Sequence, residues 1–249
     1  MTLTESAPQD PGGVEAGREC RIAQIGVGIG LASLVALTLL FWATDLDLTL
    51  VAGIHGREAA SWPLARKFPW RILHHHGAWP GLLLGAGALL GWICSLVGFA
   101  RRSWRGPCLF VVLQVLMGPG LLVNGITKNL AGRPRPYETL PFGGTLPYLR
   151  PFEFGNPHQG ASFLSGHASM AFLFMGLFFV VKGRPRWAAL AGGLAFGLLE
   201  GTARVLGGDH FPSDIVLCGA MIYTLAAATR LLSHCGMGRR KDRPAAPGT

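Results

Sequence analysis

Six apolar runs separated by short polar loops constrain the fold of this chain more than any other feature. They cover residues 22–42, 79–100, 107–126, 165–181, 187–203 and 215–232. A helix needs about 20 mainly apolar residues to cross the hydrocarbon core of a bilayer. Only helices and closed barrels satisfy every backbone polar group there. The sequence therefore predicts an all-α, polytopic membrane protein built as a six-transmembrane-helix bundle.

Composition agrees with a membrane domain. Charged residues make up only 14% of the chain, whereas soluble domains carry about 25%. The 36 glycines suit close helix–helix contact in lipid. We expect one membrane domain over residues 22–233, between a polar N-terminal tail (1–21) and a basic C-terminal tail (234–249). The five cysteines show no spacing typical of a metal site or a disulfide framework.

The net charge of +9 is spread over loops between the apolar runs. Phospholipid head groups or a phosphorylated lipid are therefore more plausible partners than nucleic acid. The positive-inside rule predicts that the loops after the second, fourth and sixth runs are cytoplasmic. Their basic residues are Arg101, Arg102 and Arg105; Lys182, Arg184 and Arg186; Arg239, Arg240, Lys241 and Arg243. The first loop opposes this orientation with Arg57, Arg66, Lys67 and Arg71.

Three short clusters lie at the edges of apolar runs, and this orientation puts all of them on the outer face. They are KNLAGRPRP (128–136), SFLSGHAS (162–169) and RVLGGDHFPSD (204–214). In the first, Lys128 ends a run, and glycine and prolines then interrupt the helix. This turn can bring the Lys128 ammonium and the Arg135 guanidinium to one anion. A basic stop beside a membrane span would look the same.

The second cluster opens the fourth run with Ser165, Gly166 and His167. Free N–H groups and the positive end of the helix dipole favour an anion at a helix start. Gly166 permits close approach of the backbone, and His167 can transfer a proton near neutral pH. An ordinary serine N-cap with an interfacial histidine is the alternative interpretation.

The third cluster holds Arg204, His210 and Asp214. If a helix begins near His210, then His210 and Asp214 lie one turn apart on the same face. The carboxylate can then hold the imidazole in one tautomer, which leaves the other ring nitrogen free to attack phosphorus. A weak surface pair is the alternative.

The order and combination of these clusters resemble the type 2 phosphatidic acid phosphatase family, within the acid phosphatase–vanadium haloperoxidase superfamily. The resemblance covers roughly residues 105–232. Leu164 stands where the family usually has proline, and Ala203 where it usually has serine. Residues 132–136, 142–144 and 162–169 are also similar to the bacterial lipid A phosphatase branch.

The resemblance implies a phosphohistidine mechanism without a metal or other cofactor. His210 would be the nucleophile, Asp214 would orient it, and His167 would protonate the leaving group. The phosphoryl oxygens would be held by Lys128, Arg135, Ser165, Gly166 and Arg204. These cations would supply the charge neutralisation that phosphoryl transfer requires. No carboxylate cluster suited to Mg²⁺ appears in the sequence.

The expected substrate is a phosphorylated membrane lipid, with lipid A favoured. Undecaprenyl pyrophosphate, phosphatidylglycerol phosphate and phosphatidic acid stay open as substrates. So do phosphotransfer to another lipid and, outside enzymes, a lipid or anion transporter; the membrane body argues against a vanadate-dependent peroxidase. The expected location is the bacterial inner (cytoplasmic) membrane, with the active site facing the periplasm or cell exterior. The sequence leaves the oligomeric state open.

Two features lie outside the clusters. Glu200 falls inside the fifth run, where a buried charge is usually paired, so we expect it to be a counterion for Arg204; a direct catalytic role is the alternative. The His74–His76 tract has no acidic or cysteine residue nearby in the sequence. We therefore do not expect it to bind a metal ion.

Overall fold

The computed structural model describes residues 11–56 and 62–241, and the regular structure in this part of the chain is helical, with no β-strand. The α-helices are α1 (Pro11–Ala43), α2 (Leu46–Ile54), α3 (Trp70–His76), α4 (Trp79–Leu96), α5 (Arg105–Val115), α6 (Lys128–Leu130), α7 (Gly166–Phe172), α8 (Pro185–Leu206) and α9 (Pro212–Lys241). A π-helical segment, η2 (Leu116–Thr127), joins α5 to α6. The 3₁₀ segments are η1 (Arg102–Trp104), η3 (Pro136–Glu138), η4 (Leu140–Phe142) and η5 (Leu173–Phe179).

Five helical runs among the described residues are long and apolar enough to cross a membrane. They are Gly13–Ala43, Trp70–Leu96, Arg102–Leu130, Pro185–Leu206 and Pro212–Ser233. The remaining predicted run, the fourth one at residues 165–181, is the shorter helix Gly166–Phe179. With the rises typical of α- and 3₁₀-helix, it is about 24 Å long, against about 30 Å of hydrocarbon. The all-α, multi-pass prediction is confirmed, and the count of six spans stays a prediction.

Helical structure reaches into both segments expected to be tails, because α1 begins at Pro11 and α9 ends at Lys241. Residues 1–10 and 242–249 lie outside the described part of the chain, as does Arg57 of the first loop. The cysteines differ from expectation in one case. Cys20 takes part in a disulfide, whereas Cys94, Cys108 and Cys218 are free.

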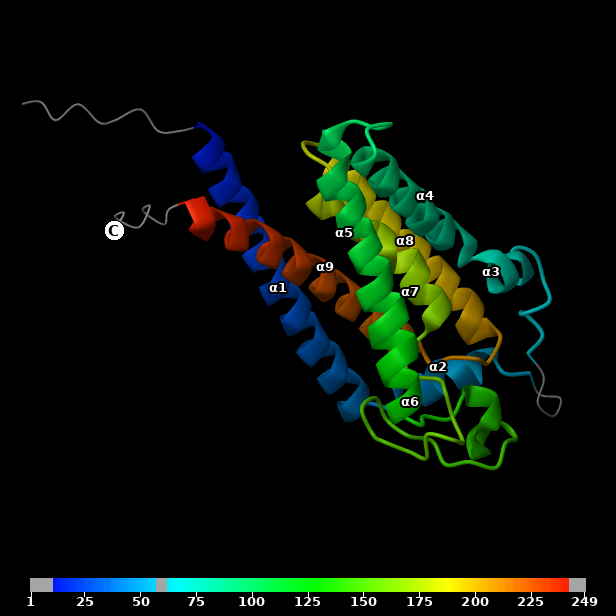
Figure 1. The fold of residues 1–249 in the computed structure, drawn as a ribbon. Helices are drawn as coiled ribbons and strands as arrows, with labels where there is room; N and C mark the ends of the chain where they lie inside the picture. Colours follow the sequence, from blue (N-terminus) through cyan, green and yellow to red (C-terminus); the bar gives the residue numbers. More distant parts are fainter. Residues whose placement is uncertain (1–10, 57–61, 242–249) are drawn as a thin grey trace, which may run out of the picture.

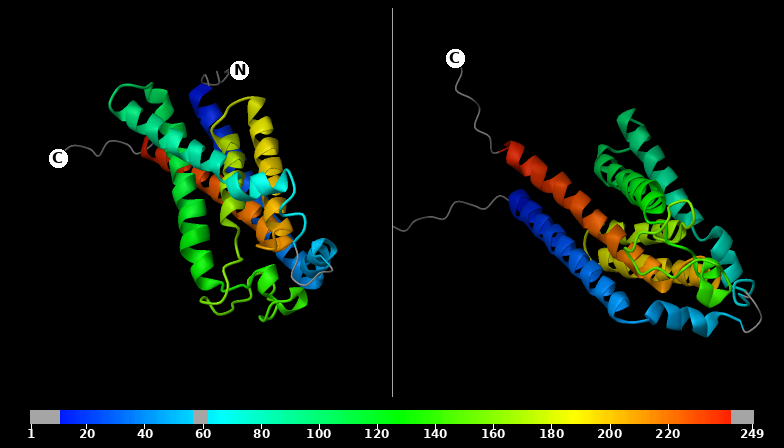
Figure 2. Two further views of the ribbon diagram at one scale, coloured as in Figure 1. Left: turned by 90° about the vertical axis from the view of Figure 1, so that its right-hand side faces the viewer. Right: turned by 90° about the horizontal axis from the view of Figure 1, so that it is seen from below.

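Glycine allows close packing between the long helices. α1 and α9 lie side by side (Figures 1 and 2), and a Cβ on Gly30 would be 2.1 Å from Oγ1 of Thr224. On the other side, α8 packs against α7 and η5, where a Cβ on Gly197 would be 2.1 Å from the ring of Phe172. Phe172 is itself fully buried in the main apolar cluster. These contacts bring the ends of α7, α8 and α9 together.

The three sequence clusters gather at one end of the bundle. Figure 1 shows this end at the bottom, where α2, α6, the start of α7 and the irregular segment 131–165 meet. The loop between α4 and α5 and the loop between η5 and α8 lie at the opposite end. The basic loops that the sequence places on one side of a membrane therefore lie opposite the clusters.

The irregular segment 131–165 folds back on itself through glycine and backbone hydrogen bonds. Gly132 has a φ of +56°, and a Cβ there would be 2.5 Å from the carbonyl carbon of Asn156, so glycine is required. Gly155 N donates to Ala131 O over 2.8 Å, and Ser162 N donates to Arg133 O over 2.9 Å. The fold-back places Ser162 beside the start of the segment.

A fully buried arginine ties this segment to two helices. Nη2 of Arg133 donates to Oδ2 of Asp47 in α2 over 2.8 Å, and Nη1 donates to Oδ1 of Asp214 in α9. Nε donates to Leu149 O over 2.9 Å, and the guanidinium lies 4.6 Å from the ring centroid of Phe211. Burial works against the charged guanidinium, but Asp214 and Asp47 together raise the pKa of Arg133. The side chain is therefore a fixed cation.

Asp47 is also bonded to the first turn of α9. Its Oδ1 accepts from Ser213 N over 2.9 Å, and its Oδ2 accepts from Ser213 Oγ over 2.5 Å. The hydroxyl of Tyr148 adds a bond of 3.2 Å to Oδ2. The short helix α2 is thus joined to α9 through a carboxylate that is only 1% exposed.

Removing the Asp47 carboxylate is predicted to destabilise the fold strongly. Asp47→Ala leaves Arg133 with one carboxylate fewer, and breaking a buried ion pair costs about 3–5 kcal/mol. Asp47→Asn keeps acceptor capacity for Ser213 and is expected to lose less. Thermal unfolding of purified protein in detergent measures both. Asp45→Asn is the control, because Asp45 is 75% exposed and its ion pair with Arg150 spans 3.9 Å; an equal loss there would contradict the prediction.

Candidate active site

Two of the predicted cations share one carboxylate. Nη2 of Arg204, near the end of α8, lies 3.0 Å from Oδ2 of Asp209. Nη1 of Arg135 lies 3.5 Å from Oδ1 of the same residue. The Arg204 guanidinium also donates from Nη1 to His74 O over 3.1 Å. Arg135 and Arg204 therefore face a common space that already holds one anionic group.

Lys128, the third predicted cation, joins them from the end of the α5–η2–α6 run. It lies within electrostatic reach of Arg135 and Arg204. A Cβ on Gly166 would be only 3.2 Å from Nζ of Lys128, so the absence of a side chain there leaves room at the ammonium group. The structure thus brings together all three cations that the sequence singled out.

Ser165 and His167 reach the same space from the start of α7. Ser165 is the N-cap of this helix, and its Oγ accepts from Ala168 N over 3.3 Å, as predicted. The hydroxyl hydrogen remains available to donate, since a serine is donor and acceptor at once. His167 lies within electrostatic reach of Arg204, His210 and Lys128. Both predicted histidines therefore lie beside the cations.

His210 is oriented by a backbone carbonyl. Its Nδ1 lies 2.7 Å from Ser162 O and 3.7 Å from Oδ2 of Asp214. Because a carbonyl oxygen can only accept, Nδ1 carries the hydrogen and Nε2 keeps its lone pair. The expectation that Asp214 itself fixes the tautomer is corrected: α9 begins at Pro212, so His210 precedes the helix and turns toward Ser162.

Asp214 stabilises the orientation of His210 through hydrogen bonds to neighbouring residues. Besides Arg133, it accepts from Ser162 Oγ over 2.6 Å and from Phe211 N over 2.9 Å, both at Oδ2. It is fully buried. Asp214 therefore holds two residues that position the His210 ring. One is Ser162, whose carbonyl accepts from His210, and the other is Phe211, the residue after His210 in the chain. Its charge also remains close enough to stabilise an imidazolium.

Burial and charge set the protonation states of the loop residues. Burial lowers the pKa of His210, and the negative charge of the nearby Asp214 carboxylate only partly opposes this. His210 is therefore neutral at neutral pH. Burial would raise the pKa of Asp209, but the hydrogen bond from His74 and the charge of Arg204 hold it below its usual range. Asp209 is therefore an anion between the two arginines.

His74 has an acidic partner that lies far away in the sequence. Its Nε2 lies 2.6 Å from Oδ2 of Asp209, a residue 135 positions away in the chain. The two neighbouring histidines make ring contacts with each other and with Trp79. Across residues 11–56 and 62–241, no group of three His, Cys, Asp or Glu side chains is placed to hold a metal ion.

Glu200 does not form the expected ion pair with Arg204. Both of its carboxylate oxygens are buried and have no hydrogen-bond partner among the described residues. They lie against Gly77, directly after the end of α3, because a Cβ on Gly77 would be 1.6 Å from Oε2 of Glu200. Asp209 takes the expected place, since it follows the end of α8 and meets the Arg204 guanidinium there.

Sequence reasoning overlooked five residues that support the site. Three lie inside the quoted clusters and had a signal in their position: Arg133, Ser162 and Asp209. Asp209 directly precedes His210, so its position in the sequence already indicated that it lies near the candidate phosphate site. His74 and Asp47 carried no such signal, because their partners are far away in the sequence.

The arrangement is suited to phosphoryl chemistry. Arg135 and Arg204 meet at the Asp209 carboxylate, Lys128 lies within electrostatic reach of both, and His210 has an unprotonated ring nitrogen. A second histidine, His167, is near enough to exchange a proton with a bound group. Such charge neutralisation and positioning are what phosphoryl transfer demands of a protein.

Comparison with known proteins agrees with this chemistry. Over 193 residues the chain is 40% identical to a lipid A 4'-phosphatase from Rhizobium etli, covering 72% of this chain and 70% of that protein. It is 33% identical to a lipid A 4'-phosphatase from Francisella tularensis subsp. novicida and 41% identical to one from Rhizobium leguminosarum. These two matches cover 49% and 48% of this chain, and about half of each relative, 56% and 52%.

No solved structure matches the chain. The model of the PAP2 superfamily matches residues 108–235, a segment that contains all eight predicted site residues and their three clusters. It amounts to 128 of the 249 residues. The chain belongs to the PAP2 superfamily.

Proposed function

We propose that this chain is an integral membrane lipid phosphatase that hydrolyses a phosphate monoester or pyrophosphate of a membrane lipid. The observation that carries the proposal is the convergence of Lys128, Arg135 and Arg204 beside His210, whose Nε2 is unprotonated. The family membership and the named activity of the three relatives support it. Lipid A is the favoured substrate, because all three relatives carry that name.

The reaction proceeds in two displacements. Nε2 of His210 attacks phosphorus while His167 protonates the leaving oxygen, so the P–O bond breaks as a P–N bond forms. A water molecule then gives a proton to His167 and attacks phosphorus, which releases phosphate and restores His210. Lys128, Arg135 and Arg204 neutralise the phosphoryl oxygens in both steps. Asp214, 3.7 Å from Nδ1, stabilises the cationic ring.

The phosphate replaces Asp209 between the two arginines. A phosphoryl group carries more charge and more acceptor oxygens than a carboxylate, so it binds the guanidinium groups more strongly. Asp209 keeps its bond to His74 and is not left without a partner. The positive charge of the resting site is therefore partly neutralised by the Asp209 carboxylate until substrate arrives.

We place the site at the outer face of a six-span bundle in the bacterial inner membrane. The basic loops at the opposite end of the molecule (Figure 1) favour a cytoplasmic position for that end. The helix Gly166–Phe179 can be short because it starts at the anion site, which would lie below the membrane surface.

Purified protein is predicted to release inorganic phosphate from lipid A in the presence of EDTA, and His210→Gln to abolish that release. Loss of the nucleophile removes the covalent step, so kcat/KM should fall by roughly 10³-fold or more. The measurement is a phosphate-release assay in detergent micelles with lipid A, undecaprenyl pyrophosphate and glycerophospholipid phosphates.

The matched control is His158→Gln, because His158 is exposed in the irregular segment and should keep full activity. Two results would contradict the proposal: activity that depends on a divalent metal ion, or a His210→Gln variant that still turns over. If phosphate were released from another lipid but not from lipid A, only the proposed substrate would change.

The acidic limb of the pH–rate profile is predicted to lie below the pKa of about 6.5 of a free imidazole. Burial lowers the pKa of His210, and the reaction needs the neutral ring. Activity should therefore persist as pH falls through 6.5 or so, and be lost only when His210 becomes protonated. The profile of kcat/KM between about pH 4.5 and pH 9 tests this; an acidic limb above neutral pH would disprove it.

A further inference from the structure

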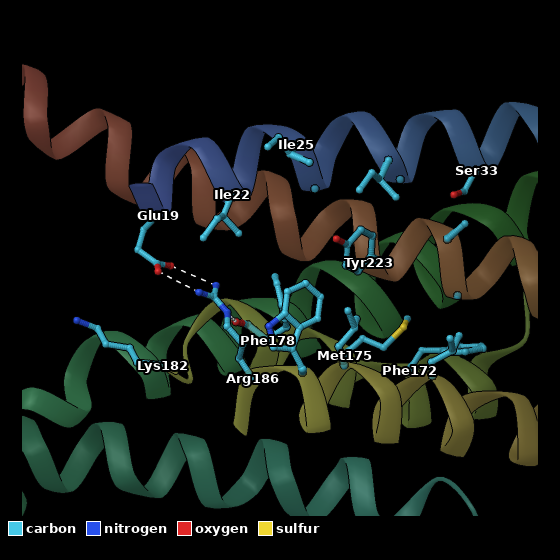
Figure 3. Close-up of a pocket in the computed structure, with 18 of the residues that line it drawn as sticks. Glu19, Ile22, Ile25, Ser33, Phe172, Met175, Phe178, Lys182, Arg186 and Tyr223 are labelled. Carbon is cyan, nitrogen blue, oxygen red and sulfur yellow. Dashed lines mark hydrogen bonds and ion pairs between the residues drawn. The ribbon is translucent and has the colours of Figure 1, made fainter. Parts of the chain in front are cut away.

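A long cavity separate from the candidate active site runs between α1 and α8. Its volume is about 1050 Å³, at the upper end of the ~300–1,000 Å³ typical of small-molecule pockets. Its walls come from α1, α9, α7, η5 and α8, with apolar side chains such as Ile22, Ile25, Met175 and Phe172 (Figure 3). Most of its surface is therefore hydrocarbon.

The cavity follows the thickness of a bilayer. Along α1 it extends from Glu15 to Leu37, which corresponds to about 33 Å of helix, and the hydrocarbon core of a bilayer is about 30 Å thick. Both helices that flank it, α1 and α8, qualify as membrane spans. Its apolar part is therefore at a depth where lipid chains are the surrounding medium.

One end of the cavity is charged. Four cations line it, Arg18, Lys182, Arg184 and Arg186, against two carboxylates, Glu15 and Glu19. Glu19 binds Arg186 in a two-pronged pair of 3.0 and 3.3 Å (Figure 3), and Glu15 binds Lys182 over 2.6 Å.

The two remaining cations are Arg18 and Arg184. Both are exposed, and neither forms an ion pair or hydrogen bond with a side chain that the structure describes. Their charges are therefore available to an anionic ligand at the mouth of the cavity.

We propose that this cavity binds an anionic phospholipid, with an acyl chain along α1 and the phosphate at Arg18 and Arg184. The apolar walls match the chain, and the excess positive charge at the mouth matches the head group. Juxtamembrane Lys and Arg residues each contribute about 1 kcal/mol to binding of anionic lipids. The lipid comes from the leaflet at the basic end of the bundle, opposite His210.

This lipid is distinct from the substrate. The mouth of the cavity is formed by the start of α1 and the η5–α8 loop, at the end of the molecule away from α6 and the start of α7 (Figure 1). At its inner end, the cavity reaches Phe172, the last residue of α7. His167 lies in the first turn of the same helix. A bound chain therefore supports the helix that positions part of the candidate active site, and it should raise thermal stability.

Native mass spectrometry and thermal unfolding of the full chain in detergent test the proposal. Long-chain phosphatidylglycerol should bind and raise Tm more than long-chain phosphatidylcholine or dihexanoyl phosphatidylglycerol. The Arg18→Gln/Arg184→Gln double variant should bind phosphatidylglycerol roughly 10- to 30-fold more weakly. The matched control, Arg101→Gln/Arg102→Gln, removes the same charge from exposed residues of the α4–α5 loop and should change binding by less than about twofold.

Each other outcome overturns the proposal. Equal loss in both double variants would show general attraction to a basic surface. If long-chain phosphatidylglycerol and phosphatidylcholine bound equally well, the head-group charge would have no role. If dihexanoyl and long-chain phosphatidylglycerol bound equally well, the apolar cavity would have no role. Displacement by inorganic phosphate would place the lipid at the catalytic cations. Because His210→Gln should bind the lipid like the unmodified chain, failure of the proposed hydrolysis leaves this test intact.

Discussion

The position of one buried guanidinium determines most of the site. Arg133 is excluded from water, and it is stable there only because α2 and α9 each supply a carboxylate. One of them, Asp214, holds the hydroxyl of Ser162, and the carbonyl of Ser162 holds His210. The orientation of the reactive imidazole therefore depends on contacts that begin in a helix outside the segment matched by the superfamily model. The segment before α9 provides the His210 imidazole, and the buried ion pairs of Arg133 hold that segment in place.

Local patterns explain what could be predicted from sequence. The apolar runs indicated the long helices, and Ser165 was recognisable as the cap of α7 because capping depends on neighbours within one turn. Lys128, Arg135 and Arg204 were recognised through the spacing of their motifs. Arg135 and Arg204 meet at Asp209, which agrees with the inferred common anion site. These features depend on short stretches of chain, or on a combination of stretches that is specific to one family.

The remaining features depend on packing between distant segments. Asp47 meets Arg133 across 86 positions and His74 meets Asp209 across 135, so no local pattern could pair them. Glu200 was assigned to Arg204 by helical spacing, yet the arginine turns to the carboxylate beyond the helix end. A helix was expected to begin near His210, and α9 does begin two residues later at Pro212, but the His210 ring bonds to Ser162 O and not to Asp214. In each case side-chain direction, which spacing does not encode, decided the partner.

The carboxylate of Asp209 has a consequence for turnover. In the proposed reaction the two arginines hold inorganic phosphate after hydrolysis, and this product would leave slowly from a purely positive pocket. Asp209 remains tethered to His74 nearby, so it competes for Arg135 and Arg204 at a very high local concentration. The protein thereby carries its own displacing anion, which limits product inhibition and keeps the empty pocket from trapping salts.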